Sequence, residues 1–218
     1  MSDDAVLYFT RHGESVANAS DKAGVRRPAD SDRLSDRGWE QARGVGRRLK
    51  GMELDLIVCS DMRRARETAA GIAEVLDLPV EVDADLREVQ QSDAFEAASP
   101  HFGDTGNLNW MPDHPTDFAE PGAESFDDIV TRVHAVQERL TERASAQHFV
   151  TVSHFGFLHF FLGAVLFGEA FGPEHCRPLY NAGHANTGIS IFERRRRTMD
   201  SMVFDGWSLT TWNDQAHL

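Results

Sequence analysis

Apolar positions follow two spacings along the chain: short runs typical of buried strands, and longer stretches with a helical period. The short runs are Ala5 to Phe9, Leu54 to Cys59, Val80 to Leu86 and His148 to Ser153, with two later ones at Gly188 to Glu193 and Ser201 to Phe204. Helical spacing covers about 36–50, 62–76, 125–143 and 157–166, and it is most regular between Ser125 and Arg143. Strands separated by helices predict a mostly parallel sheet with helices on both faces, a three-layer αβα sandwich of the α/β class.

Two stretches follow neither spacing. Residues 19–36 are polar and predict a loop. Residues 89–122 combine prolines and aromatic residues without a regular period. Because a structureless loop of this length is uncommon inside a compact domain, we expect a small helical insertion or lid over the active site. The pattern therefore predicts a single domain over residues 1–218 with a lid at about 89–122.

Composition narrows the range of partners. The chain has 218 residues, 41% of them hydrophobic, which is enough to bury one substantial core. Its formal net charge of -13 argues against nucleic acid as a partner, because binding to the phosphate backbone needs a basic face. The one dense basic run, Arg194 to Arg197, adjoins a predicted strand and is typical of a solvated edge or hairpin.

Nothing in the sequence predicts a membrane or an oxidising compartment. The first ten residues carry two aspartates and no cationic segment of the kind that opens a signal peptide. The longest apolar stretch, around Phe155 to Phe167, is interrupted by glycine and histidine and is too short to span a bilayer. Cys59 and Cys176 are far apart and indicate no disulfide framework. We therefore expect a cytoplasmic protein without membrane contact, and a homodimer remains open.

Charged and polar side chains follow the predicted strands at matching places. Arg11 and His12 follow the first strand, and the helix after the second opens with Arg63, Arg64 and Arg66; Glu88 follows the third strand and His154 the fourth. The carboxyl ends of parallel strands share one edge of a sheet, where ligands bind. Arginines match tetrahedral oxyanions, so this edge predicts a site for a phosphoryl group. The sequence has neither a P-loop motif nor a clear aspartate cluster for magnesium, so we expect no cofactor and no metal.

Several of these segments resemble the motifs of one enzyme family. Arg11-His-Gly-Glu-Ser15 is similar to the signature of the histidine phosphatase superfamily, the phosphoglycerate mutase-like group, and Ser60-Asp-Met-Arg-Arg-Ala-Arg-Glu-Thr-Ala69 to its second motif. Leu86-Arg-Glu88 resembles the segment that carries the proton donor, and Val152-Ser-His154 the one with the second histidine. With similar stretches at 34–42, 121–125 and 213–218, the resemblance covers nearly the whole chain.

The resemblance implies a role for each matching residue. His12 is expected to be the nucleophile of a phosphohistidine intermediate, a role that a neutral imidazole in a tight turn between arginines can also fill on chemical grounds. Glu88 is expected to be the general acid and then the base for water. Phosphate binding is expected from Arg11, Asn18, Arg64 and His154. Phe155 stands where the family usually has glycine, which suggests an aromatic wall beside the phosphate.

Three classes of function remain open. The first is a metal-independent phosphomonoester hydrolase, a phosphatase of the histidine acid type. The second is a cofactor-dependent phosphoglycerate mutase, and the third a non-catalytic binding module on the same fold. The intact Arg11, His12, Arg64, Glu88 and His154 argue against the third. Residues 89–122 contain no lysine or arginine but six acidic residues, which predicts a hydrolase for small monoesters with a neutral or cationic remainder.

Overall fold

A six-stranded sheet forms the centre of the computed structural model, which describes residues 4–90, 123–199 and 202–218. The strands are β1 (Ala5–Arg11), β2 (Leu56–Cys59), β3 (Val80–Val82), β4 (Phe149–Ser153), β5 (Ile189–Met199) and β6 (Met202–Asp214). Their order is β3-β2-β4-β1-β5-β6. The first four strands of this order run parallel, whereas β5 is antiparallel to both β1 and β6.

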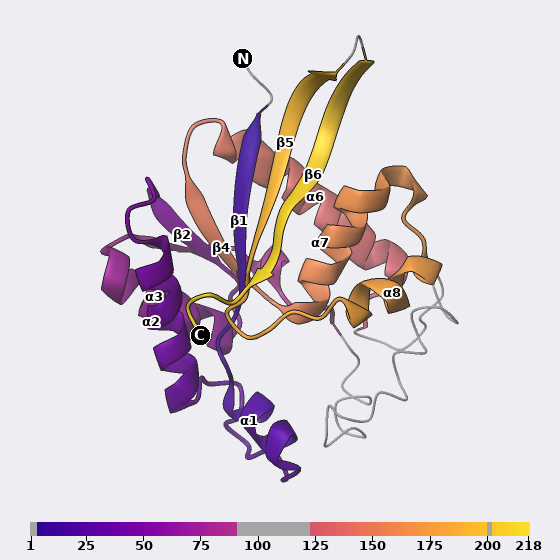
Figure 1. Ribbon diagram of the computed structural model, residues 1–218. Coiled ribbons are helices and arrows are strands. Elements are labelled where there is room, and N and C mark those ends of the chain that lie inside the picture. The colour runs from indigo at the N-terminus through magenta and orange to yellow at the C-terminus, as the bar shows by residue number, and fades with distance from the viewer. Residues whose placement is uncertain (1–3, 91–122, 200–201) are drawn as a thin grey trace.

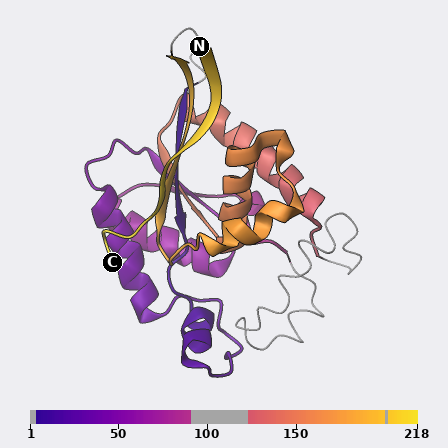
Figure 2. The same cartoon turned by 45° about the vertical axis from the view of Figure 1, so that its right-hand side comes forward.

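Helices cover both faces of the sheet. They are α1 (Val16–Ala23), α2 (Asp36–Leu49), α3 (Arg63–Leu76), α6 (Phe126–Ala144), α7 (Phe155–Phe167) and α8 (Cys176–Asn181), with short 3-10 turns at Ala84–Leu86, Gly168–Ala170 and Pro173–His175. Helices α2 and α3 lie on one side of the sheet, α6 and α7 on the other, and α1 stands beyond its edge (Figure 1). A view turned by 45° shows α8 beside α7 (Figure 2). The predicted α/β class and three-layer order are confirmed.

Alternation along the strands divides the core between the two helical layers. In β2, Leu56 and Val58 face α6 and α7, while Ile57 and Cys59 face α2 and α3. Helix α7 is apolar on all sides, and its residues from Gly156 to Val165 are buried. A helix that is hydrophobic all round belongs in the interior, so α7 offers a fixed base for the residues at its amino end.

The parallel strands bring the predicted site residues to one edge. Arg11 at the end of β1 is in register with Ser153 at the end of β4, and Cys59 of β2 with Val152. The next backbone amides continue these ladders: the His12 amide donates to the Ser153 carbonyl at 2.9 Å and the Ser60 amide to the Val152 carbonyl at 3.0 Å. His12, Ser60 and His154 therefore leave three adjacent strands at the same level.

Several predicted elements differ from those observed. The loop expected over 19–36 begins with helix α1, which is closed at its start by a capping box of Ser15 and Asn18. The third strand ends at Val82, because the Asp83 side chain accepts the Asp85 amide and turns the chain into a 3-10 helix. Helix α7 begins at Phe155, two residues earlier than expected, and the two last strands are longer than predicted. The lid expected at 89–122 lies outside the described residues, apart from its first two residues, Val89 and Gln90.

The arginine run 194–197 lies in a hairpin, as expected. Arg194 pairs with Trp207 and Arg197 with Phe204 across β5 and β6. This hairpin rises past the other strands (Figure 1). Among the described residues, no helix combines the length and the apolar character needed to cross a bilayer.

Candidate active site

His12 lies buried in a backbone turn at the end of β1. Its Nδ1 is 2.8 Å from the Gly13 carbonyl oxygen, which can only accept, so Nδ1 carries the hydrogen and Nε2 presents a lone pair. The Gly13 amide donates to Thr68 Oγ1 of α3 at 2.9 Å. A Cβ at Gly13 would come within 2.6 Å of the Gly38 carbonyl oxygen, so only glycine permits this close approach of α2 to the turn. The imidazole is thus fixed in both tautomer and position.

Arg64, in the first turn of α3, binds the free nitrogen of this imidazole. Its Nε donates to His12 Nε2 at 3.1 Å. Burial lowers the pKa of His12 well below its ordinary value of 6.5, and the charges of Arg64 and Arg11 lower it further. The imidazole is therefore neutral near pH 7, which is the form that can attack phosphorus.

Arg11 reaches the same space from the end of β1. One terminal nitrogen, Nη1, donates to the His184 carbonyl at 2.6 Å, and the guanidinium carbon lies 5.0 Å from the centre of the Phe155 ring. Its buried Nε has no hydrogen-bond partner among the residues that the structure describes. Burial lowers the pKa of Arg11 to about 10, so the side chain remains a cation at neutral pH. A buried cation with an unpaired donor is an expected partner for an anion.

His154 follows β4 and faces His12, with 5.2 Å between the ring centres. Its Nε2 is 2.9 Å from Ser60 Oγ, and within the described ranges its buried Nδ1 has no hydrogen-bond partner. Burial, together with the nearby arginines and His12, lowers the pKa of His154 well below 6.5. His154 is therefore neutral here, and the negative charge of a bound phosphoryl group would favour its protonation.

Glu88 is held against the amino end of α7. Its Oε1 accepts from the backbone amides of Val89 at 2.9 Å and Phe157 at 3.1 Å. A Cβ at Gly156 would lie 2.5 Å from this oxygen, so the helix backbone approaches the carboxylate closely. In the described part of the chain no hydrogen bond reaches Oε2, which leaves that oxygen free to exchange a proton. The charge of Glu88 also acts on Arg11, which places both in one electrostatic environment.

Asn18 lies in α1 and is connected to the turn at His12 and Gly13 through a second asparagine. Asn186 donates from Nδ2 to both the His12 carbonyl and Asn18 Oδ1, each at 3.1 Å. Asn18 Oδ1 also accepts the Ser15 amide. The side chain predicted to bind phosphate is therefore near the turn, with its oxygen engaged in structure and its amide nitrogen left as the donor for an anion.

Phe155, predicted as an aromatic wall, is the first residue of α7 and packs against two aromatic side chains as well as against Arg11. Its ring centre is 4.2 Å from that of His159 and 5.3 Å from that of Tyr180. Burial lowers the pKa of His159 to about 4 and raises that of Tyr180 well above 10. This uncharged aromatic group lies beside Arg11 at the amino end of α7.

Sequence reasoning missed the residues that support the site from a distance. Thr68 and Asn186 bind the turn at His12 and Gly13, His184 binds Arg11, and Ser60 contacts His154. Asp32 was also missed: its carboxylate accepts from Arg64 Nη1 and, at 3.1 Å, from the Arg63 amide. Ser60 and Thr68 lie within the Ser60–Ala69 motif without a role assigned to them, whereas Asp32, His184 and Asn186 lie outside the recognised motifs. Each comes from a segment remote from its partner.

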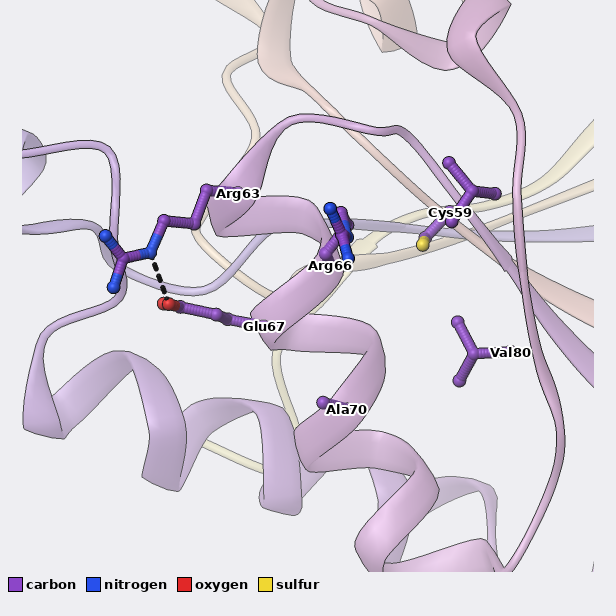
Figure 3. Close-up of a pocket in the computed structure, with 7 residues that line it drawn as sticks. Cys59, Arg63, Arg66, Glu67, Ala70 and Val80 are labelled. Carbon is purple, nitrogen blue, oxygen red and sulfur yellow. Dashed lines mark hydrogen bonds and ion pairs between the residues drawn. The ribbon is translucent and has the colours of Figure 1, made fainter.

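Of the three arginines in this part of α3, only Arg64 joins the site. Arg63 and Arg66 instead border a hollow of about 600 Å³ between α3 and β3, together with Cys59, Glu67, Ala70, Val80 and Val82. Figure 3 shows the ion pair of Arg63 and Glu67 at its rim, where Arg63 Nε is 2.7 Å from Glu67 Oε1. The structure thus separates Arg64 from its neighbours as the motif implied.

The structure therefore brings His12, Arg11, Arg64, Glu88, His154 and Phe155 together at one edge of the sheet, with Asn18 linked to them. The arrangement combines a neutral imidazole, two cations and a carboxylate with one free oxygen. Among the residues that the structure describes, no cluster of histidine, cysteine and carboxylate side chains has the geometry to hold a metal ion.

Comparison with known proteins agrees with this geometry. The sequence profile of the histidine phosphatase superfamily (branch 1) matches residues 7–215. The adenosylcobalamin/alpha-ribazole phosphatase of Escherichia coli is 28% identical over 168 residues, covering 73% of this chain and 78% of that protein. Phosphoglycerate mutase-like protein 4 of Arabidopsis thaliana is 29% identical over 227 residues, covering 99% of this chain and 88% of that protein.

A solved structure supports the same relationship. Mycobacterial glucosyl-3-phosphoglycerate phosphatase matches with a TM-score of 0.70 at 25% identity, over 97% of this chain and 100% of that chain. The family resemblance of the motifs is thus confirmed over nearly the whole length, and the relatives include phosphatases. The chain belongs to the histidine phosphatase superfamily, branch 1.

Proposed function

We propose that this protein is a metal-independent phosphomonoester hydrolase of the histidine acid type, which acts through a phosphohistidine on His12. The observation that supports this most directly is the state of the imidazole. Its Nδ1 hydrogen is committed to the Gly13 carbonyl, and its Nε2 lone pair points to Arg64. A nitrogen nucleophile held beside a cation is prepared for a phosphoryl group and for little other chemistry.

The reaction needs only groups already described. His12 Nε2 forms a bond to phosphorus while the bond to the ester oxygen breaks, and Glu88 gives its proton to that oxygen. Arg11 and Arg64 neutralise the charge on the equatorial oxygens, a contribution of about 3 kcal/mol for a single well-placed donor. Glu88 then takes a proton from water, whose oxygen displaces His12 and releases phosphate.

Hydrolysis is favoured over phosphoryl isomerisation by the charge of the chain next to Glu88. A mutase must bind a substrate with a second anionic group and keep its phosphoenzyme away from water. Residues 89–122 offer no lysine or arginine for that group and six acidic residues instead. The similar proteins include a phosphatase and a phosphoglycerate mutase-like protein, so the proposal of a hydrolase rests on the charge of this segment in the present chain.

Trapping the intermediate tests the nucleophile. Rapid quenching with labelled substrate should give an acid-labile, alkali-stable phosphoprotein, and His12→Ala should abolish both the label and turnover. His148→Ala is the matched control, since His148 is exposed and lies before β4, at the opposite end of that strand from His154. Label that survives in His12→Ala would refute the assignment.

A coupled assay tests the reaction class. We expect phosphate release from monoesters, no stimulation by 2,3-bisphosphoglycerate and little interconversion of 2- and 3-phosphoglycerate. Efficient interconversion that depends on the bisphosphate would replace the phosphatase by the mutase.

Leaving groups of different basicity test Glu88. An alkyl phosphate needs a proton on its leaving oxygen, whereas p-nitrophenyl phosphate does not. Glu88→Gln should therefore lower kcat by about 100-fold or more for the alkyl ester and far less for the aryl ester. Arg64→Ala should lower both alike, because both esters share the phosphoryl group; equal losses in Glu88→Gln would assign Glu88 another role.

A further inference from the structure

Arg132 of α6 is bound to the backbone of the segment that carries Glu88. Its Nη1 donates to the Asp85 carbonyl at 2.6 Å and to the Arg87 carbonyl at 2.9 Å, and Nη2 lies 3.4 Å from the Glu88 carbonyl. One guanidinium thus gathers three carbonyl oxygens from four consecutive residues. A planar cation with donors in fixed directions defines the path of a backbone in a way that a flexible ammonium cannot.

Glu124 holds this guanidinium from the other side. Its carboxylate forms a two-bond pair with Arg132, at 2.6 Å from Nε and 2.7 Å from Nη2, and both side chains are only 16% exposed. The same carboxylate accepts the Gln90 amide at 2.8 Å, while the Glu124 amide donates to the Gln90 carbonyl at 2.9 Å. Residues on both sides of Glu88 are therefore fixed to one ion pair.

The pair also reaches the structure that holds the Glu88 side chain. The guanidinium carbon of Arg132 lies 5.3 Å from the centre of the Phe157 ring, and the Phe157 amide donates to Glu88 Oε1. Arg132 therefore contacts the main chain of Glu88 and the residue that anchors its carboxylate. Movement of Arg132 would displace both supports of Oε1 and, with them, the free oxygen Oε2.

We propose that Arg132 and Glu124 are positioning residues that place the Glu88 carboxyl over the leaving oxygen of the substrate. The proposal rests on the general-acid role of Glu88 in the proposed function. Neither side chain touches the substrate; they act by fixing the backbone from Asp85 to Gln90. An error of about 1 Å in the position of a catalytic group can cost about 100-fold in rate, so their loss should be felt in proton transfer.

Arg139 provides a matched control on the same helix. It lies two turns after Arg132 and also binds this region, through Asp83 at 2.7 Å and Asp85 at 3.1 Å. Its partners are side-chain carboxylates, and it is 45% exposed. Arg139 therefore has the same charge and helix, but it holds no carbonyl next to Glu88.

The experiment compares kcat and KM for an alkyl phosphate and for p-nitrophenyl phosphate in each variant. Arg132→Ala should lower kcat for the alkyl ester by about 10- to 100-fold and for the aryl ester by less than about 3-fold, with KM little changed. Glu124→Gln should give a smaller split of the same sign, and Arg132→Lys a partial recovery. Arg139→Ala should leave both rates within about 2-fold of the parent protein.

A double variant separates this proposal from the one on which it depends. If Arg132 acts through Glu88, adding Arg132→Ala to Glu88→Gln should not increase the alkyl–aryl split further. Equal losses for both esters in Arg132→Ala, or a split that adds fully to that of Glu88→Gln, would overturn the positioning role while the acid role of Glu88 stands. A Glu88→Gln protein without any split would overturn the acid role itself and the positioning role with it. Arg132→Lys and Glu124→Gln keep the test valid if Arg132→Ala fails to fold.

Discussion

The Arg64 guanidinium binds two partners, the His12 imidazole and the Asp32 carboxylate. One edge binds His12 Nε2, while Nη1 is paired with Asp32, whose side chain is 41% exposed. A phosphoryl group that binds here must share the cation with this carboxylate. Asp32 therefore keeps Arg64 oriented and, at the same time, reduces the charge available to the product.

Replacing Asp32 by asparagine should strengthen phosphate binding. Asparagine keeps one oxygen that can accept from Arg64, loses the oxygen that accepts the Arg63 amide, and removes the competing negative charge. We expect the inhibition constant of inorganic phosphate to fall by about 3- to 10-fold, since a nearby charge of this kind is worth about 1 kcal/mol at a half-exposed position. The measurement is competitive inhibition by phosphate at neutral pH. Unchanged or weaker inhibition would show that Asp32 serves orientation alone.

The sequence was enough to predict the residues with distinctive chemistry but not those that hold them. His12 and His154 follow apolar strands and stand in recognisable segments, so their convergence follows from parallel topology. Ser60 and Asn186 are common polar residues whose partners lie far along the chain, and their roles depend on contacts that no local pattern records. The same applies to Asp32, because nothing in the sequence distinguishes it from the other aspartates of the polar stretch 19–36.

At the scale of elements, the start of α7 is stabilised by a tertiary contact in place of a capping side chain from its own sequence. Its N-cap position is His154, whose side chain makes no capping hydrogen bond. The Phe157 amide is satisfied instead by Glu88, which lies 69 positions earlier in the chain than Phe157. Because its own sequence offers no capping side chain, the start of this helix was predicted two residues too late.

For helix α1 and strand β3, the predictions were wrong because the pattern of apolar residues did not match the observed structure. The Ser15–Asn18 capping box was present in the sequence, but α1 buries only Ser20 and so lacks an apolar stripe to reveal it. In β3 all three residues are exposed, and the alternation that continues to Leu86 belongs partly to a 3-10 turn. By contrast, α6 has both a regular apolar face and the Ser125 cap, and its bounds were predicted within one residue.

Buried histidines around α7 should make the fold sensitive to mild acid. The pKa is lowered to about 4 in His159 and about 3 in His184, and well below 6.5 in His12 and His154, in each case chiefly by burial. The unfolded chain therefore takes up these protons first. Their contribution to stability is complete above about pH 6.5 and is lost as the pH falls below it, by up to about 1.4 kcal/mol per pH unit for each group.

Urea unfolding in phosphate-free buffers between about pH 7 and about pH 5.5 measures this slope. Carboxyl groups with ordinary or lowered pKa values change little in that window, so the histidines dominate. His159→Phe should reduce the slope by about one histidine's share. A free energy of unfolding that stays constant across the window would contradict the neutral, buried state of these side chains.

At the scale of the whole molecule, the net charge of -13 opposes the approach of an anionic substrate. The attraction of Arg11 and Arg64 acts at short range, while the surplus of acidic residues acts over distances that salt screens. For a small dianionic ester, kcat/KM should therefore rise by about 2- to 5-fold between about 20 mM and about 300 mM sodium chloride. An ester whose remainder carries a positive charge should respond less, and rates that fall with salt for both would show that the site arginines dominate at long range.

The close contact between Gly13 and Gly38 has an evolutionary consequence. The chain leaves the nucleophile turn, forms α1 and returns to the same place, where Ser15 bridges to Leu34 and the Ser35 amide donates to the Glu14 carbonyl. The segment between Ser15 and Leu34 is therefore closed where its two ends meet, so insertions, deletions and substitutions within it can accumulate without moving His12. Because Asn18 and Asp32 lie in this segment, recombination or drift there changes what surrounds the phosphate while the nucleophile is inherited intact.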